Sequence, residues 1–180
     1  MGTMKITEIT ESWDDRRFRW HDHGQATLKP IYYWSYGMLC DPDNMQYPGT
    51  KEVGRARLNG YKLELLGHAN VVPDSGHIWG TLWRINYNVL SNLDEVEGYP
   101  DYYTRITRPV TTDNGDTVEA QIYVMTDSSR QNSLDRGPNI RYVKMIAAGY
   151  NNVGIPIEQL KTAWLECQER LRNLEDKSKY

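Results

Sequence analysis

The residues best suited to acid–base chemistry form one acidic run, Leu93-Asp94-Glu95-Val96-Glu97-Gly98. Its three carboxylates fall at the expected C-terminal end of a helix, where the helix dipole is already negative, and such a run is typical of a solvated face. Glu97, however, directly precedes Gly98, which can adopt a left-handed backbone and turn the chain so that the preceding side chain points inward. In an aromatic pocket this carboxylate would be desolvated, its pKa would rise, and it could act as a general acid or base near neutral pH. The run alone leaves both interpretations open.

A second feature with possible chemistry follows the aromatic run at residues 31–36. Tyr36 and Gly37 come at the end of this run, where a glycine permits close approach of the backbone to a small ligand. Successive N–H groups in such a turn form an anion-binding nest. A plain turn explains the same dipeptide, so the pair does not decide between the two.

Other catalytic centres have little support in the sequence. His21 and His23 could ligate a metal, but they supply only two local ligands where catalytic zinc usually has three, so a solvated polar arm is the simpler interpretation. His68 and His77 lie near predicted turns and are expected to be structural, because no G-x-S-x-G nucleophile motif accompanies them. Walker and dinucleotide-binding glycine motifs are also absent from the sequence. We therefore expect neither a metal nor a cofactor.

Composition narrows the class of protein. The 180 residues fit one domain, and a net charge of −3 offers no basic surplus for nucleic acid. No apolar run approaches the ~20 residues of a membrane span, and residues 13–17 are charged where a signal peptide would be apolar, so we expect a cytosolic protein. Cys40 and Cys167 are too few for a disulfide framework. The 13 Tyr and 6 Trp suit a core that opens onto a polar pocket, although an ordinary aromatic-rich core has the same composition.

The elements that must position these residues are mostly strands. Residues 1–30 are polar and without period, so we interpret them as an N-terminal arm or extension. Strands are expected at 31–36 and 77–85, a strand pair or one bent strand at 55–66, and a hairpin from 102–111 and 118–125 around the turn at 113–116. Asp41 and Pro42 have the composition of a helix start, and apolar spacing predicts a short helix at 88–97.

The C-terminal third has a clearer helical pattern. Residues 128–139 are expected to form a polar loop, and 141–148 either a strand or a short helix. Apolar residues at three- and four-residue steps from Ile157 to Leu171 predict an amphipathic helix, with a frayed tail after Glu175. Strands in the middle and helices at the ends predict an α+β fold with a mostly antiparallel sheet or barrel, in a single domain at 31–175.

Taken in order, these segments resemble the gamma-glutamylcyclotransferase family, including its AIG2-like relatives. The family opens with Tyr-Gly-Ser-Asn and an Asp-Pro-x-x-Met segment, continues through Leu-x-Gly-Tyr-x-Leu, Gly-x-x-Trp and Leu-Asp-x-x-Glu-Gly, and closes with Tyr-x-x-x-Ile and Gly-Leu-Pro. The matching residues are Tyr36-Gly37 with Asp41-Pro42-Asp43-Asn44-Met45, Leu58-Asn59-Gly60-Tyr61-Lys62-Leu63, Gly80-Thr81-Leu82-Trp83, the run ending in Glu97-Gly98, Tyr103, Ala120-Gln121-Ile122-Tyr123-Val124-Met125, Tyr142-Val143-Lys144-Met145-Ile146, Gly149 and Gly154-Ile155-Pro156.

This resemblance implies a small six-stranded-type barrel with flanking helices and a cofactor-free enzyme of the acyltransferase or lyase class. Its small-molecule substrate would carry a γ-glutamyl group, and Glu97 would be the general acid/base that releases 5-oxoproline. Backbone N–H groups of the turn at Tyr36, Gly37, Met38 and Leu39 would bind the substrate. Tyr103 and Tyr142 match family tyrosines near the cavity.

The chain departs from the family at one place in this turn, where Met38-Leu39 replaces Ser-Asn. If backbone groups make the substrate contact, the replacement is compatible with the chemistry. If the Ser or Asn side chain makes it, the substrate differs or the chain is a small-molecule-binding module that has kept the barrel without the reaction. A protein-interaction role of the acidic, aromatic-rich surface is a third alternative. The sequence does not identify the leaving amine or the oligomeric state.

Overall fold

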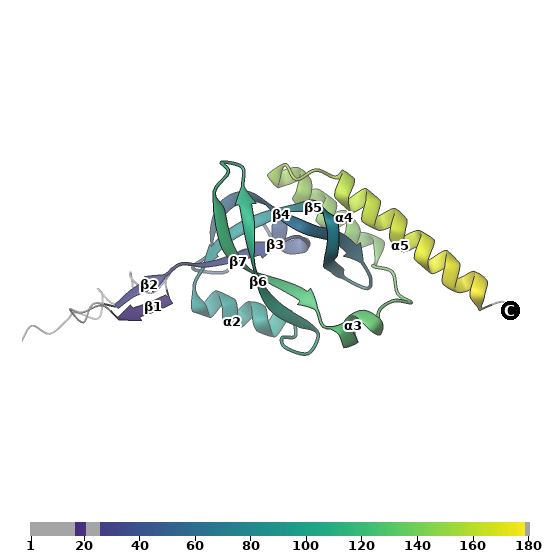
Figure 1. The fold of residues 1–180 in the computed structure, drawn as a ribbon, viewed down its shortest axis with the longest axis horizontal. Helices are drawn as coiled ribbons and strands as arrows, with labels where there is room; N and C mark the ends of the chain where they lie inside the picture. The colour runs from purple at the N-terminus through teal and green to yellow at the C-terminus, as the bar shows by residue number, and fades with distance from the viewer. Residues whose placement is uncertain (1–16, 21–25, 179–180) are drawn as a thin grey trace, which may run out of the picture.

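The computed structural model describes residues 17–20 and 26–178, with side chains from Pro30 onward (Figure 1). The strands are β1 (Arg17–Trp20), β2 (Ala26–Lys29), β3 (Ile31–Ser35), β4 (Lys51–Leu65), β5 (Ala69–Ile85), β6 (Tyr103–Thr112) and β7 (Thr117–Met125). The helices are η1 (Met38–Cys40), α2 (Tyr87–Val96), α3 (Asp127–Gln131), α4 (Ile140–Val153) and α5 (Glu158–Lys177). The predicted α+β class is confirmed.

Five of these strands close into a barrel in the order β3-β5-β4-β6-β7. Neighbouring strands pair antiparallel, except that β3 meets β7 in parallel where Tyr33 lies opposite Gln121. The six-stranded barrel implied by the resemblance is therefore wrong for the described part of the chain. The parallel closure joins the first strand of the barrel to the last, so the end of β3 lies beside β7.

The long β4–β5 pair bends instead of folding back at the Asn59-Gly60 turn signal. The register shifts between Asn59 and Tyr61, and Gly60 adopts a φ of +79° that suits glycine. The bent-strand alternative is thus confirmed for β4. On β5, Gly80 permits the closest backbone approach, since an added Cβ would lie 2.2 Å from the Ser35 carbonyl oxygen.

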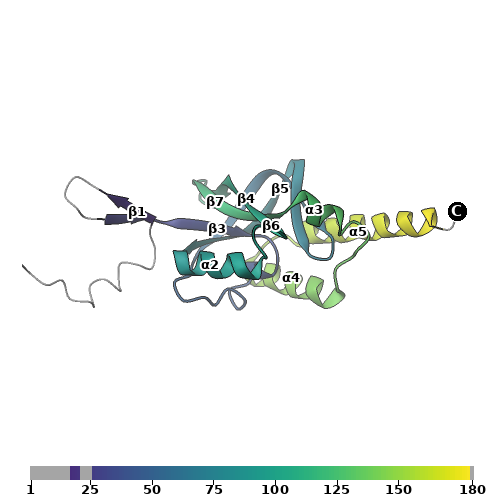
Figure 2. The same ribbon diagram turned by 90° about the horizontal axis from the view of Figure 1, so that it is seen from below.

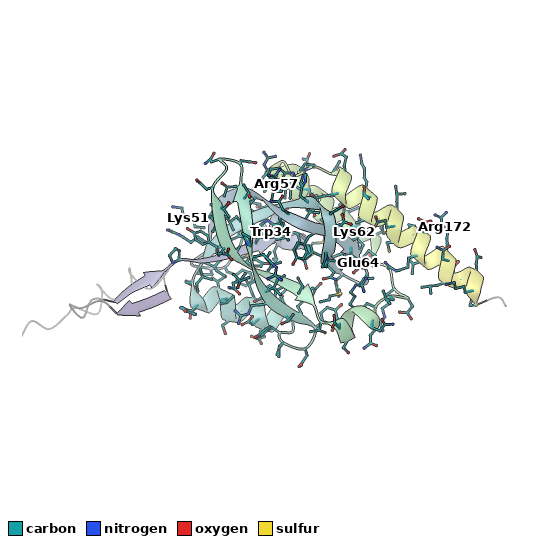
Figure 3. The ribbon with its side chains drawn as sticks, viewed as in Figure 1. Trp34, Lys51, Arg57, Lys62, Glu64 and Arg172 are labelled. Carbon is teal, nitrogen blue, oxygen red and sulfur yellow. The ribbon has the colours of Figure 1, made fainter. Side chains whose placement is uncertain are left out.

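Two buried clusters hold the helices on the barrel. One contains Trp34, whose indole N–H donates to the Ala56 carbonyl, and it extends under α4 and α5. The other contains Val89, Leu90 and Leu93 of α2 together with residues of β3, β5, β6 and β7. Figures 1 and 2 show α2 and α5 at opposite sides of the barrel. Figure 3 shows Trp34 enclosed by the strands, with Lys51, Arg57, Lys62 and Glu64 following β4 and Arg172 on α5.

The helices confirm some expectations and correct others. The helices predicted around 88–97 and 157–171 are present as α2 and α5, and the undecided segment at 141–148 belongs to α4. The helix start predicted at Asp41 is wrong, because Asp41 ends η1 and is followed by a single turn. The polar loop at 128–139 contains most of α3, which Thr126 caps. The tail after Glu175 continues α5 to Lys177.

The N-terminal arm contains a separate two-stranded antiparallel ribbon, formed by β1 and β2. Both views show this ribbon projecting away from the barrel (Figures 1 and 2). Within the described ranges, no helix has the length and apolar character needed to cross a membrane.

Candidate active site

Helix α2 delivers Glu97 to the barrel. The Asn86 side chain accepts from the Val89 N–H at the start of the helix, and Leu93 is fully buried near its end. Glu97 is the C-cap residue, and Gly98 follows with a φ of +62°, the left-handed conformation expected from the sequence. The chain therefore turns away immediately after Glu97. Val96, the last residue of α2, is 65% exposed.

A cavity of about 550 Å³ opens beside Glu97. It contains all of the residues that the sequence singled out as a site, namely Tyr36, Gly37, Met38, Leu39, Glu97, Tyr103 and Tyr142. The other lining residues are Tyr33, Ser35, His68, Ala69, Glu95, Val96, Gly98, Tyr102 and Tyr123. The lining includes no lysine or arginine, so its charges come from carboxylates and its hydrogen-bonding groups are largely phenolic.

Burial raises the pKa of Glu97 from its ordinary value of 4.5 to about 7. The cause is desolvation: the carboxylate is half-buried, and nothing in its surroundings offsets the loss of water. Burial and then the Glu97 charge raise the pKa of Tyr33, which lines the same cavity. A carboxyl group with this pKa exists in both protonation states near neutral pH, as proton shuttling requires.

The cavity that Glu97 lines is also lined by a turn formed by Gly37, Met38 and Leu39, hereafter the 37–39 turn. Its three carbonyl groups accept hydrogen bonds within the protein, from the Cys40 N–H, the Asn44 amide and the Ser35 hydroxyl, respectively. Its three N–H groups donate to no acceptor in the described part of the chain. These N–H groups can therefore serve an anionic or carbonyl oxygen in the cavity.

The 37–39 turn is held from behind by α4. Gly149 packs so closely that an added Cβ would lie 2.9 Å from the Asp41 Cβ, and the Asn152 amide donates to the Asp41 carboxylate at 3.2 and 3.3 Å. The Tyr150 hydroxyl donates to the Tyr36 carbonyl at 2.6 Å. The backbone on both sides of the turn is thus fixed to one helix.

Tyr103 and Tyr142 converge on Ala69. The Tyr103 hydroxyl donates to the Ala69 carbonyl at 2.6 Å, and the Tyr142 hydroxyl oxygen accepts the Ala69 N–H at 3.2 Å. The Tyr142 hydroxyl proton is therefore not used in that contact and is available to a ligand. Burial raises the pKa of Tyr142 to about 12, so this hydroxyl keeps its proton near neutral pH.

Sequence reasoning missed several cavity residues. Tyr33 and Ser35 alternate along β3 on the cavity side, so the strand period was the available signal. His68, expected to be structural, lines the cavity, and its Nδ1 lies 2.9 Å from the Tyr102 hydroxyl oxygen. Tyr123 also lines it, within the Ala-Gln-Ile-Tyr-Val-Met segment matched to the family but not chosen as a site.

Among residues 17–20 and 26–178, no group of three or more His, Cys, Asp and Glu side chains is placed to hold a metal ion. His21 and His23 lie outside the described residues. His77 lies on β5, where its ring meets the edge of Trp79.

This chain is similar to known proteins of one family. Residues 33–143 match the family described as gamma-glutamyl cyclotransferase, AIG2-like. The chain is 27% identical to human gamma-glutamylcyclotransferase, over 79% of this chain and 78% of the human protein. It is also 27% identical to the mouse gamma-glutamylcyclotransferase, with 85% and 83% covered. A solved structure of a gamma-glutamyl cyclotransferase superposes with a TM-score of 0.63 at 24% identity, covering 75% of this chain and 86% of that structure.

Proposed function

Because this chain belongs to the gamma-glutamyl cyclotransferase, AIG2-like family and is a gamma-glutamylcyclotransferase-like enzyme, we propose that it releases 5-oxoproline from a γ-glutamyl amide with Glu97 as general acid/base. One observation carries the proposal: Glu97 and the 37–39 turn, whose N–H groups have no acceptor in the described part of the chain, line a single cavity. The cytosolic location expected from the sequence remains part of this proposal.

The reaction begins with the ionised Glu97 carboxylate, which takes a proton from the α-ammonium of the substrate. The freed amine attacks the γ-carbonyl carbon of the same molecule, and a new C–N bond closes the five-membered ring. Protonated Glu97 then donates to the departing nitrogen, and the original amide C–N bond breaks. Two protons leave the α-nitrogen in total and both end on the amine as its ammonium form, so Glu97 finishes ionised as it began.

The cavity supplies what an intramolecular reaction needs beyond this proton transfer. Holding the substrate folded, with its amine near its own γ-carbonyl, can contribute several kcal/mol to lowering the barrier, roughly 7–11 in the best oriented model reactions. The N–H groups of the 37–39 turn would hold the α-carboxylate or the oxygen that becomes negative during attack. The Tyr142 hydroxyl proton is a further donor on the same wall.

The test measures 5-oxoproline release by the wild-type protein and by Glu97→Gln. The panel contains γ-glutamyl-alanine, as a γ-glutamyl amino acid, and Nε-(γ-glutamyl)-lysine, as a γ-glutamyl amine. We expect equal amounts of 5-oxoproline and free amine from wild type, and loss of both from Glu97→Gln, which keeps the size of the side chain but cannot exchange the proton. Unchanged release by Glu97→Gln would overturn the assigned role.

The apolar side chains of Met38 and Leu39 favour a second candidate, a binding module on the same barrel. Both residues line the cavity where the family carries Ser and Asn. This candidate predicts that the γ-glutamyl compounds raise the melting temperature of the protein without being consumed. Measurable turnover of either compound would remove it.

A further inference from the structure

Asp94 carries contacts that the proposed reaction does not use. It lies on α2, one helical turn before Glu97, and its side chain is 24% exposed. Its Oδ1 accepts the Tyr123 hydroxyl at 2.6 Å and lies 3.2 Å from Nε of Arg105. A single carboxylate oxygen therefore joins α2 to β7 and to β6, the two strands next to each other in the barrel.

Tyr123 continues this connection along the cavity lining. Its ring lines the cavity and meets Tyr33 edge-on with centroids 5.8 Å apart. Its backbone carbonyl accepts the Tyr36 hydroxyl at 2.7 Å. Because Tyr36 directly precedes the 37–39 turn, these two hydrogen bonds, joined through Tyr123 itself, connect the helix before Glu97 to that turn.

Arg105 holds the chain on the other side of Glu97. Its guanidinium lies over the Tyr99 ring at 4.6 Å, and the Tyr99 N–H donates to the Asp94 carbonyl at 2.8 Å. The residues before and after Glu97-Gly98 are thus tied to each other and to β6. The Glu97 backbone N–H donates to the Leu93 carbonyl at 2.8 Å, but within the described residues its carboxyl makes no hydrogen bond or ion pair, so the place of that carboxyl depends on the backbone that these neighbours hold.

We propose that Asp94 is a positioning residue, which through Tyr123 fixes the distance between the Glu97 carboxyl and the 37–39 turn. This inference rests on the proposed function, because the distance matters for catalysis only if Glu97 and the 37–39 turn act on the same substrate. An aspartate suits the task because its Oδ1 accepts the Tyr123 hydroxyl at 2.6 Å while it lies beside the Arg105 guanidinium, and a hydrogen bond to a carboxylate is short and directional. Misplacing reacting groups by about 1 Å can cost on the order of 100-fold in rate.

The experiment compares Asp94→Ala, Tyr123→Phe and the double variant in 5-oxoproline release. Each single variant removes the same connection, so we expect kcat to fall by roughly 10- to 100-fold with KM changed far less. The double variant should lose no more than Asp94→Ala alone, because both changes break one path. Tyr123→Phe keeps the ring and its packing, so it tests the connection even where Asp94→Ala folds poorly.

Two matched controls separate this role from a general loss of polar contacts. Asp113→Asn removes a carboxylate paired with Arg55, and Tyr61→Phe removes a hydroxyl bonded to Arg108, both away from the cavity lining. We expect kcat close to wild type for both. Single variants at Asp94 and Tyr123 with kcat within twofold of wild type, or with losses that multiply in the double variant, would overturn the inference.

A readout without turnover keeps this test independent of the proposed function. Carbon-13 NMR of the glutamate carboxyl groups follows the titration of Glu97 in wild type and in Tyr123→Phe. Since burial raises the pKa of Glu97 to about 7, a displaced carboxyl that reaches water should titrate closer to 4.5. An unchanged titration would contradict the positioning role, whereas absence of 5-oxoproline release by wild type would count against the proposed function alone.

Discussion

At the scale of the residue, Glu97 occupies a place that disfavours its charge. The C-terminal end of α2 is electronegative, and the cavity around the carboxyl is lined by tyrosines without a lysine or arginine. The free energy that an ionised Glu97 costs is the same physical quantity as its raised pKa, since both express the lost hydration of the charged form. A carboxyl held at this cost does not stabilise the fold through its charge, which agrees with the catalytic role that we propose for it.

The first prediction concerns stability. The pKa of Glu97 is higher in the folded state than in the unfolded state, where it is 4.5, so the folded state binds the proton more tightly. The stability that this proton provides is fully present below pH 4.5 and is lost as the pH rises through about 7. Glu97→Gln carries no charge and escapes that loss. We expect its free energy of unfolding to exceed that of wild type by on the order of 3 kcal/mol at pH 8 and to match it at pH 4.

Urea denaturation of both proteins at the two pH values measures this difference. A variant that is less stable than wild type at pH 8 would show that Glu97 makes favourable contacts as an ion. An equal gain at both pH values would trace the effect to packing instead of charge.

At the scale of the element, α4 acts as the support of the 37–39 turn. Its closest approach is at Gly149, where an added Cβ would lie 2.9 Å from the Asp41 Cβ and 3.3 Å from the Asp41 backbone nitrogen. The segment after the turn cannot remain in place if this position gains a side chain. The turn can therefore lie where it does only because residue 149 has no side chain.

The second prediction follows from this contact. Gly149→Ala should displace the 37–39 turn and lower kcat by roughly tenfold. Its effect on global stability should be small, because alanine is a better helix former than glycine by about 1 kcal/mol and offsets part of the strain. Thermal melting and 5-oxoproline release, measured together, separate the two effects.

Gly67→Ala is the matched control, since nothing lies within 4 Å of a Cβ at that position. It should retain wild-type kcat. Gly149→Ala with unchanged kcat would show that the turn is not held by α4.

The elements themselves were predictable where a local signal is strong. The turn at 113–116 with alternating strands beside it gave β6 and β7, and apolar spacing gave α2 and α5. The helix expected at Asp41 failed because a capping residue and a proline make one turn as readily as a helix. The segment at 141–148 stayed undecided because its apolar residues fit a buried strand as well as a helix, and only packing against η1 and the barrel distinguishes them.

The site was only partly predictable because some of its residues come together through pairing between strands that are far apart in the chain. Gly98 directly after Glu97 is a local feature, and it correctly indicated the sharp turn. Tyr33 and Tyr123 lie far apart in the chain and meet because β3 pairs with β7 in parallel, a pairing without a local signature. The family resemblance supplied Tyr103 and Tyr142, which residue types alone did not single out.

At the scale of the whole molecule, the barrel closure is what creates the cavity. The parallel pair of β3 and β7 sets the end of the first strand beside Tyr123, while α2 brings Glu97 to the same place. The cavity lining begins at Tyr33, and β1 and β2 form a sheet of their own. We therefore propose that residues 31–175 are the functional domain.

The third prediction tests this division. Deleting residues 1–29 should leave the circular dichroism spectrum of the barrel unchanged, because every barrel strand begins after that point. 5-Oxoproline release should remain within about twofold of the full chain. An unfolded product would show that the arm is part of the fold, and a folded product without activity would show that it completes the site.

The pH dependence of kcat/KM for 5-oxoproline release tests the role of Glu97 most directly, because that profile reports the ionisation of the free enzyme. The ionised carboxylate is the reactive form, so kcat/KM should fall about tenfold per pH unit below its pKa and level off above it. Since burial raises that pKa to about 7, the account predicts a wild-type midpoint near 7. A rate that stays constant from pH 5 to pH 8, or a Glu97→Gln variant with the same activity and the same midpoint, would contradict it.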